Sequence, residues 1–222
     1  MAVKCRDLVD FPEYGKFGIR PKSRAARVLT ALKEKKIVSN DDYLWFKTRM
    51  GVNDCIKQAF YNSQGSRALI KYGHIGNAWL LNDAIVFFRK AGNLKQALEL
   101  IEQNDDFVCV KDVRLRSGLL TSSGAVLKDC GQFDKAIRFG KKAYSLHESY
   151  SSCTLVGSCY VVLGRVSDAD KWFKQAKMLG CSSAVSVSSE YKRLYLASNG
   201  QTRMLIKKQM LKSGVNFDWM EK

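Results

Sequence analysis

Proline is scarce in this chain. Only Pro12 and Pro21 are proline, and none follows up to residue 222. Because proline interrupts helices and marks turns between strands, this scarcity favours long helices and argues against a β-sandwich. No apolar run approaches the roughly 20 residues that span a bilayer. The residues from Met1 to Asp7 lack the apolar core of a secretory signal, so we expect a cytoplasmic protein without membrane partners.

Motifs for catalysis and metal binding are also missing. There is no phosphate-binding Gly-Lys-Ser/Thr loop, Gly-x-Ser-x-Gly elbow, His-Glu-x-x-His pair or Rossmann glycine fingerprint, and His74 and His147 are the only histidines. The cysteines are odd in number, irregularly spaced and without a Cys-x-x-Cys pair, which favours reduced thiols over a disulfide framework or a zinc site. They are Cys5, Cys55, Cys109, Cys130, Cys153, Cys159 and Cys181. We predict a protein that is not an enzyme and has no cofactor.

Basic residues are in large excess and lie toward both ends. The chain has 37 Lys and Arg against 21 Asp and Glu, a net charge of +16. Residues 1–75 carry +8, residues 76–150 carry +2 and residues 151–222 carry +6. This distribution predicts two basic regions on either side of a nearly neutral centre, available to nucleic acid or to an acidic protein surface.

The first basic region contains a predicted helix over residues 24–36, with Ser23 as its N-cap. Ala25, Val28, Leu29 and Leu32 share one face of that helix, and basic residues occupy another. A solvated helix face is the simpler interpretation of this pattern, and a binding surface is the alternative. The candidate contacts to nucleic acid or an acidic partner, from both ends of the chain, are Lys16, Arg20, Lys22, Arg24, Arg27, Lys35, Arg203, Lys207 and Lys208.

Small residues recur at a spacing of 33 in the centre of the chain. Gly124, Gly131, Ala136 and Ala143 are followed 33 residues later by Gly157, Gly164, Ala169 and Ala176. Such a period indicates stacked helical hairpins. In the later copy Ser149 caps a helix over 150–163, Gly164 ends it, and a second helix covers 167–179. An earlier copy begins near Leu81, and residues 185–198 with 201–213 suggest a degenerate capping hairpin.

The repeat resembles the tetratricopeptide repeat (TPR). Its pattern of a large apolar residue, Leu-Gly, Tyr, then Ala with Phe four residues on is matched in the third copy by Cys153, Val156, Gly157, Tyr160, Ala169 and Phe173. The second copy offers Leu120, Ser123, Gly124, Leu127 and Ala136, with Gly140 at the aromatic position. The first offers Leu81, Ala84, Ile85, Phe88, Ala97 and Ile101, and the segment from Ala91 to Leu98 is also similar to pentatricopeptide repeats, which bind single-stranded RNA.

The resemblance implies an all-α protein, a right-handed α-solenoid of helical hairpins with an N-terminal helical extension. The expected organisation is a basic helical region over 1–75, three TPR-like hairpins over 76–181, and a capping hairpin with a tail over 182–222.

In tetratricopeptide proteins the first helices of the hairpins line a concave, peptide-binding groove. The resemblance assigns Asn82, Arg89, Thr121, Lys128, Thr154 and Ser158 to that groove. Two functions follow as hypotheses. In the first, the chain is an adaptor within a nucleic-acid-associated assembly, and its groove binds a partner protein or peptide. In the second, its basic ends bind RNA or DNA directly.

Overall fold

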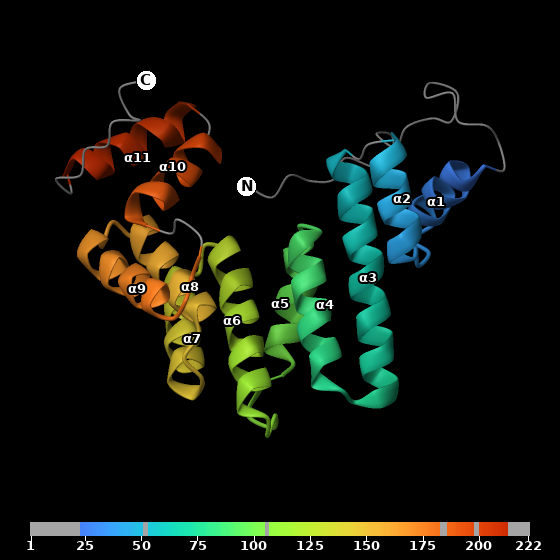
Figure 1. The fold of residues 1–222 in the computed structure, drawn as a ribbon, viewed down its shortest axis with the longest axis horizontal. Helices are drawn as coiled ribbons and strands as arrows, with labels where there is room; N and C mark the ends of the chain where they lie inside the picture. Colours follow the sequence, from blue (N-terminus) through green and yellow to red (C-terminus); the bar gives the residue numbers. More distant parts are fainter. Residues whose placement is uncertain (1–22, 51–52, 105–106, 183–185, 198–199, 213–222) are drawn as a thin grey trace. The chain divides into compact units, whose positions relative to one another are not determined.

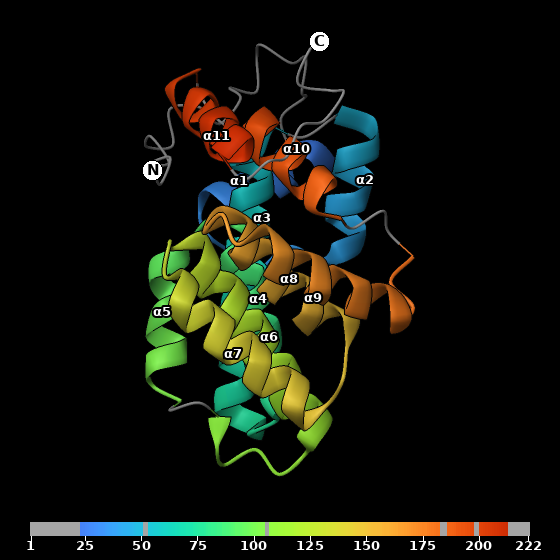
Figure 2. The ribbon, with the colours of Figure 1, turned by 90° about the vertical axis from the view of Figure 1, so that its left-hand side faces the viewer.

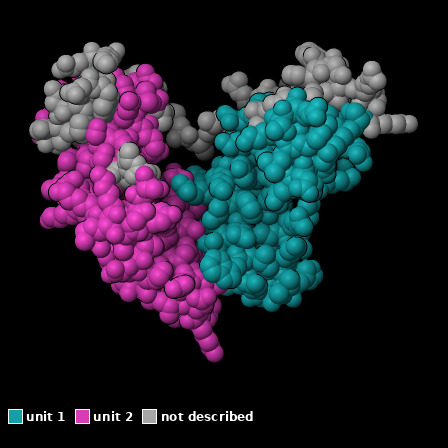
Figure 3. Space-filling model, in the orientation of Figure 1, with its two compact units in different colours: residues 1–105 teal, residues 106–222 magenta. Residues whose placement is uncertain are grey.

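The computed structural model describes residues 23–50, 53–104, 107–182, 186–197 and 200–212. These residues form eleven α-helices and contain no strand (Figure 1), which confirms the all-α prediction. The chain divides into two compact units, residues 1–105 and residues 106–222 (Figure 3). This division falls inside the segment 76–181 that the repeat pattern delimits.

The helices of the first unit are α1 (Arg24–Lys33), α2 (Asn40–Met50), α3 (Asp54–Ile75), α4 (Ala78–Lys90) and α5 (Leu94–Glu102). Helix α1 begins as predicted, because the Ser23 hydroxyl accepts a hydrogen bond of 3.2 Å from the Ala26 backbone N–H. It ends at Lys33 rather than at residue 36, since Lys35 adopts a left-handed backbone conformation with φ of 57°. The predicted apolar face of α1 is buried in a core with residues of α2 and α3, where the rings of Tyr43 and Phe60 stack 3.7 Å apart.

Helix α3 is a single helix of 22 residues. Gly65 lies near its middle, and a glycine inside a helix is ordinarily destabilising. Here the ring of Phe88 in α4 packs directly against the backbone at Gly65. The helix therefore continues through the glycine because a tertiary contact uses the space that a side chain would occupy.

The helices of the second unit are α6 (Val113–Asp129), α7 (Phe133–Leu146), α8 (Tyr150–Val162), α9 (Val166–Met178), α10 (Val187–Ala197) and α11 (Gly200–Lys212). The helices of each consecutive pair, α6–α7, α8–α9 and α10–α11, pack together (Figures 1 and 2). The predicted ends of α8 hold: the Ser149 hydroxyl accepts from the Ser152 backbone N–H at 3.3 Å, and Gly164 follows with φ of 72°. Helix α8 also contacts both α6 and α10, so three first helices of hairpins are neighbours.

The same contact between a glycine and a phenylalanine occurs in both units. A Cβ atom at Gly157 of α8 would lie 2.7 Å from Cε1 of Phe173 in α9, and one at Gly65 of α3 would lie 2.7 Å from Cε1 of Phe88 in α4. Both rings are buried, and in each hairpin a fully buried alanine, Ala169 or Ala84, precedes the phenylalanine by four residues. The hairpin α3–α4 thus repeats the packing of α8–α9.

This packing differs from the predicted register of the first copy. The sequence pattern predicted α4 as the first helix of a hairpin with α5. In the structure, Phe88 of α4 packs on Gly65 of α3 as Phe173 of α9 packs on Gly157 of α8, so α4 is the second helix of a hairpin with α3. The physical reason is helix length. Gly65 and Ala84 are 19 residues apart while Gly157 and Ala169 are 12 apart, so the longer α3 conceals the spacing.

Paired substitutions on α3 test the glycine contact. Gly65→Ala should lower the free energy of unfolding by about 1–3 kcal/mol, because the new methyl group overlaps a buried ring. Gly73→Ala is the matched control: a Cβ there meets nothing within 4 Å, so it should raise stability by about 0.5–1 kcal/mol. Urea denaturation followed by circular dichroism measures both. An equal gain from the two substitutions would show that the contact does not exist.

Candidate binding surfaces

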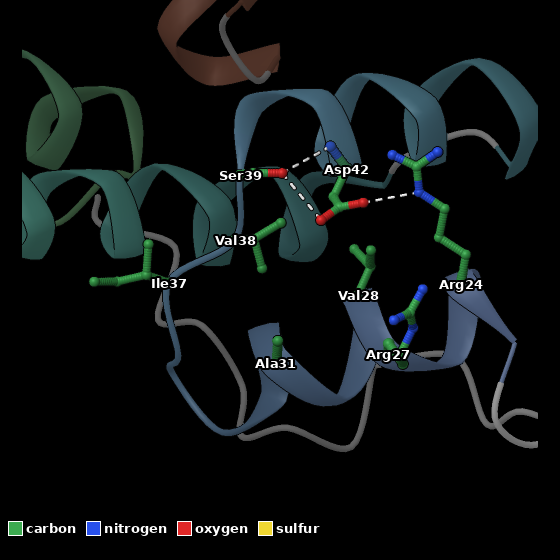
Figure 4. A pocket seen from close by; sticks show the side chains of 8 residues that line it. All are labelled: Arg24, Arg27, Val28, Ala31, Ile37, Val38, Ser39 and Asp42. Carbon is green, nitrogen blue, oxygen red and sulfur yellow. Dashed lines mark hydrogen bonds and ion pairs between the residues drawn. The ribbon is translucent and has the colours of Figure 1, made fainter.

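A pocket opens in the first unit between α1, the α1–α2 connection and the start of α2 (Figure 4). Its volume is about 200 Å³. One side is apolar and the other carries charged and hydroxyl groups. The lining residues are Val28, Ala31, Ile37, Val38, Arg24, Arg27, Ser39 and Asp42.

Arg24 is held in place by its neighbours in this pocket. Its Nε donates to Oδ1 of Asp42 at 2.8 Å, and its guanidinium lies 4.8 Å from the centre of the Trp45 ring. The Ser39 hydroxyl donates to the other carboxylate oxygen of Asp42 at 3.0 Å. The hydrogen bond from Arg24, followed by that from Ser39, lowers the pKa of Asp42 below its usual range, so Asp42 is ionised at neutral pH. The carboxylate of Asp42 therefore neutralises the charge of Arg24.

Arg27 is in a different situation. It is exposed, points into the same pocket (Figure 4), and forms no ion pair with any residue that the structure describes. A second hollow of about 350 Å³ adjoins it and is lined by Ala26, Arg27, Thr30, Ala31, Glu34 and Lys36. The two hollows share Arg27 and Ala31 as lining residues, so Arg27 lies where they meet.

The predicted basic residues are thus distributed over different environments. Lys16, Arg20 and Lys22 lie outside the described residues. Arg203 of α11 donates to the backbone carbonyls of Tyr195 and Leu196 in α10, at 3.0 and 3.3 Å, and serves the α10–α11 hairpin. Lys35 is exposed beyond the end of α1, and Lys207 and Lys208 are exposed on α11. The residues of α1 and α11 belong to different units.

The six predicted groove residues are also divided between the units. Asn82 and Arg89 are on α4, and the other four are on α6 and α8. The hydroxyls of Thr121 and Thr154 donate to carbonyls of their own helices, at 2.9 Å to Ser117 and 3.0 Å to Ser151. Ser158 is 8% exposed. Of the four residues in the second unit, Thr121, Lys128 and Thr154 are therefore the more accessible.

A buried carboxylate in the second unit, which interacts with two of the predicted groove residues, was not predicted from the sequence. Glu190 of α10 is 9% exposed and accepts two hydrogen bonds from Arg193, from Nε at 2.9 Å and Nη2 at 2.7 Å. Burial alone raises the pKa of Glu190, but the hydrogen bonds and charge of Arg193, the charge of Lys128 and a hydrogen bond with Ser158 outweigh it and hold this pKa below the ordinary value. Glu190 thereby links α10 to side chains of α6 and α8. The Glu-x-x-Arg spacing within the predicted last hairpin was the available signal.

The buried thiols are unreactive at neutral pH. Burial raises the pKa of Cys153 to about 11 and that of Cys159 to about 12, so both are protonated at neutral pH. Among the described residues no group of three or more His, Cys, Asp or Glu side chains is arranged to hold a metal ion. Within the same residues, every helix is too short or too polar to cross a bilayer.

Comparison with known proteins finds no match, either among models of protein families or among curated proteins.

Replacing Glu190 by Gln tests its part in holding α10. At pH 7 Glu190→Gln should lower the free energy of unfolding by about 1–3 kcal/mol, because two hydrogen bonds to a charged acceptor are weakened. The pKa of Glu190 is lower in the folded state than in the unfolded state, where it is 4.5. Glu190 therefore stabilises the folded state fully above pH 4.5, and this stabilisation is lost as the pH falls through its pKa in the folded state. The difference in the free energy of unfolding between the variant and the parent protein should therefore be smaller in acid. Urea titrations at pH 7 and at pH 3, which is about 1.5 units below 4.5, would measure it.

Asp170→Asn is the control for this experiment. Asp170 pairs with Lys174 at 2.7 Å, but both side chains are at least half exposed, so its loss should cost less than about 1 kcal/mol. A Glu190→Gln penalty that is absent at pH 7, or equal at both pH values, would contradict the assignment.

Proposed function

We propose that the protein is a non-enzymatic helical-repeat adaptor. Its hairpins form a TPR-like right-handed solenoid, and the first helices bind a segment of a partner protein. The repeated glycine–phenylalanine contact in α3–α4 and α8–α9 supports a repeat architecture, since the same interhelical packing occurs in hairpins far apart in the sequence.

One observation carries the proposal. Lys128 of α6 and Ser158 of α8 both act on Glu190 of α10, and α8 packs against both α6 and α10, so three successive first helices are neighbours. Stacked hairpins place equivalent faces of their first helices in a row, and such a row is the surface on which helical repeats bind extended or helical segments. Ser158 and Glu190 form a hydrogen bond that connects α8 and α10 within this row. Thr121, Lys128 and Thr154, on α6 and α8, are the partly accessible residues of the row.

The chemistry of that row favours a protein segment. It offers hydroxyls and a single lysine, which can bind a peptide backbone or a carboxylate. The net charge of +16 makes an acidic or nucleic-acid-containing assembly the natural setting for this partner.

Obstructing the row tests the proposal. Thr154→Tyr adds a ring to the partly exposed face of α8 and should abolish partner binding without unfolding the protein. Ser167→Tyr adds the same ring to an exposed position of α9, the second helix of that hairpin, and should bind normally. Affinity purification with quantitative mass spectrometry compares the partners that each variant retains. Partners retained equally by both variants would exclude the row as the binding surface.

Direct binding of RNA or DNA is the second candidate function. It is favoured by exposed lysines near both ends of the described chain. These are Lys33 at the end of α1, Lys35 and Lys36 just after it, and Lys207, Lys208 and Lys212 on α11. Lysines that contact phosphates displace counterions, and affinity then falls steeply with salt.

A salt titration tests this candidate. Fluorescence anisotropy with a short single-stranded RNA and a DNA duplex should show that the double variant Lys207→Gln, Lys208→Gln lowers the log–log salt slope by about 1.5–2. Lys174→Gln is the control, because Lys174 already pairs with Asp170. An unchanged slope in the double variant would remove α11 from any nucleic-acid interface.

A further inference from the structure

We propose that the pocket between α1 and α2 binds an acidic segment of a partner protein, with an aliphatic side chain in the apolar hollow and the neighbouring carboxylate on Arg27. The inference rests on the proposed function, in that the protein binds other proteins, and it assigns a second binding surface in the first unit.

The apolar half of the pocket fits an aliphatic side chain. Val28 and Val38 form buried parts of its wall, and Ala31 and Ile37 complete it. A water molecule occupies about 30 Å³ of liquid, so a hollow of about 200 Å³ has room for a group of side-chain size. Ile37 is 50% exposed, and an aliphatic side chain seated beside it would bury apolar surface on both partners.

The polar half of the pocket selects an anion. The charges of Arg24 and Asp42 cancel within their ion pair, and the Ser39 hydroxyl is donated to the same carboxylate. Arg27 adds a positive charge that no described residue pairs with. A guanidinium has several N–H donors whose geometry matches the two oxygens of a carboxylate. A ligand that complements the polar half of the pocket therefore carries one carboxylate beside the aliphatic group.

The second hollow extends the site for a longer chain. It meets the first at Arg27 and Ala31 and continues to Thr30 and Lys36. Lys36 and Glu34 form an exposed ion pair at 2.7 Å, so this end is polar and nearly neutral. An extended segment can therefore cross α1 with its acidic residue at the centre.

The same features distinguish a protein segment from nucleic acid. A phosphate backbone would use Arg27 but would leave the aliphatic hollow empty. The pocket lining contains no aromatic ring on which a base could stack, and the ring of Trp45 on α2 already has the guanidinium of Arg24 over it. The aliphatic and anionic halves are used together only by a chain that carries both groups.

The experiment is an NMR titration of the full-length, ¹⁵N-labelled protein with a capped pentapeptide that has Asp-Leu-Asp at its centre. Arg27→Gln should weaken binding about two- to fivefold, the range for loss of an exposed ion pair. Arg49→Gln makes the same change at an exposed arginine of α2 outside the pocket and should leave binding unchanged.

Changes to the apolar half and to the peptide complete the test. Ile37→Ser should weaken binding, whereas Ile70→Ser, at a position of α3 that is 56% exposed, should not. Peptides with Asn for Asp or Ser for Leu should also bind more weakly. Equal binding by Arg27→Gln and Arg49→Gln, or an RNA oligonucleotide that shifts the Arg27 and Ala31 signals while the peptide does not, would overturn the proposal.

The outcome is separable from that of the proposed groove. Thr154→Tyr lies in the second unit and should bind the pentapeptide as the parent does. If the peptide binds and Thr154→Tyr retains all partners, the pocket proposal stands and the groove proposal fails. If Thr154→Tyr loses partners and the peptide does not bind, the reverse holds.

Discussion

The contact of a phenylalanine ring with the backbone of a glycine on the preceding helix is the constraint on which the hairpins α3–α4 and α8–α9 depend. With no side chain at Gly65 or Gly157, the helix axes approach closely enough for the buried rings of Phe88 and Phe173 to fill the space between them. A small residue one helical turn before each ring, Ala84 or Ala169, is fully buried for the same reason. Because a protein interior tolerates neither an added methyl group nor a void, this contact fixes how each pair of helices is aligned.

That alignment determines which side chains remain available for binding. In the second unit, α8 packs against both α6 and α10, and Glu190 of α10 interacts with Ser158 of α8 and with the charge of Lys128 of α6. The cost of burying the carboxylate of Glu190 is compensated by Arg193, Lys128 and Ser158. In the first unit, the start of α2 lies against α1, and Arg24 and Asp42 form an ion pair, whereas Arg27 forms no ion pair with any described residue.

Local features of the fold were predictable from the sequence, as was the approach of α8 and α9 at Gly157 and Phe173, whereas the other long-range contacts were not. Ser23, Ser149 and Gly164 act within one turn of their helices, so residue type and spacing sufficed to place those helix ends. The contact of Gly65 with Phe88 joins residues whose spacing differs from that of the other hairpin, and no fixed period reveals it. Likewise, Arg24 was identified as a basic candidate, but its partner Asp42 is 18 residues away on another helix. The TPR-like solenoid and the binding functions remain proposals, which rest on how these hairpins pack.

The most direct measurement is the proton NMR spectrum of the two glycines. A glycine whose backbone lies under an aromatic ring has Hα resonances shifted upfield by the ring current, with nuclear Overhauser effects to the ring protons. We expect both signs at Gly65, from Phe88, and at Gly157, from Phe173, and neither at the open position Gly73. Ordinary Hα shifts without ring contacts at Gly65 and Gly157 would contradict the packing on which this account of the fold and its binding surfaces depends.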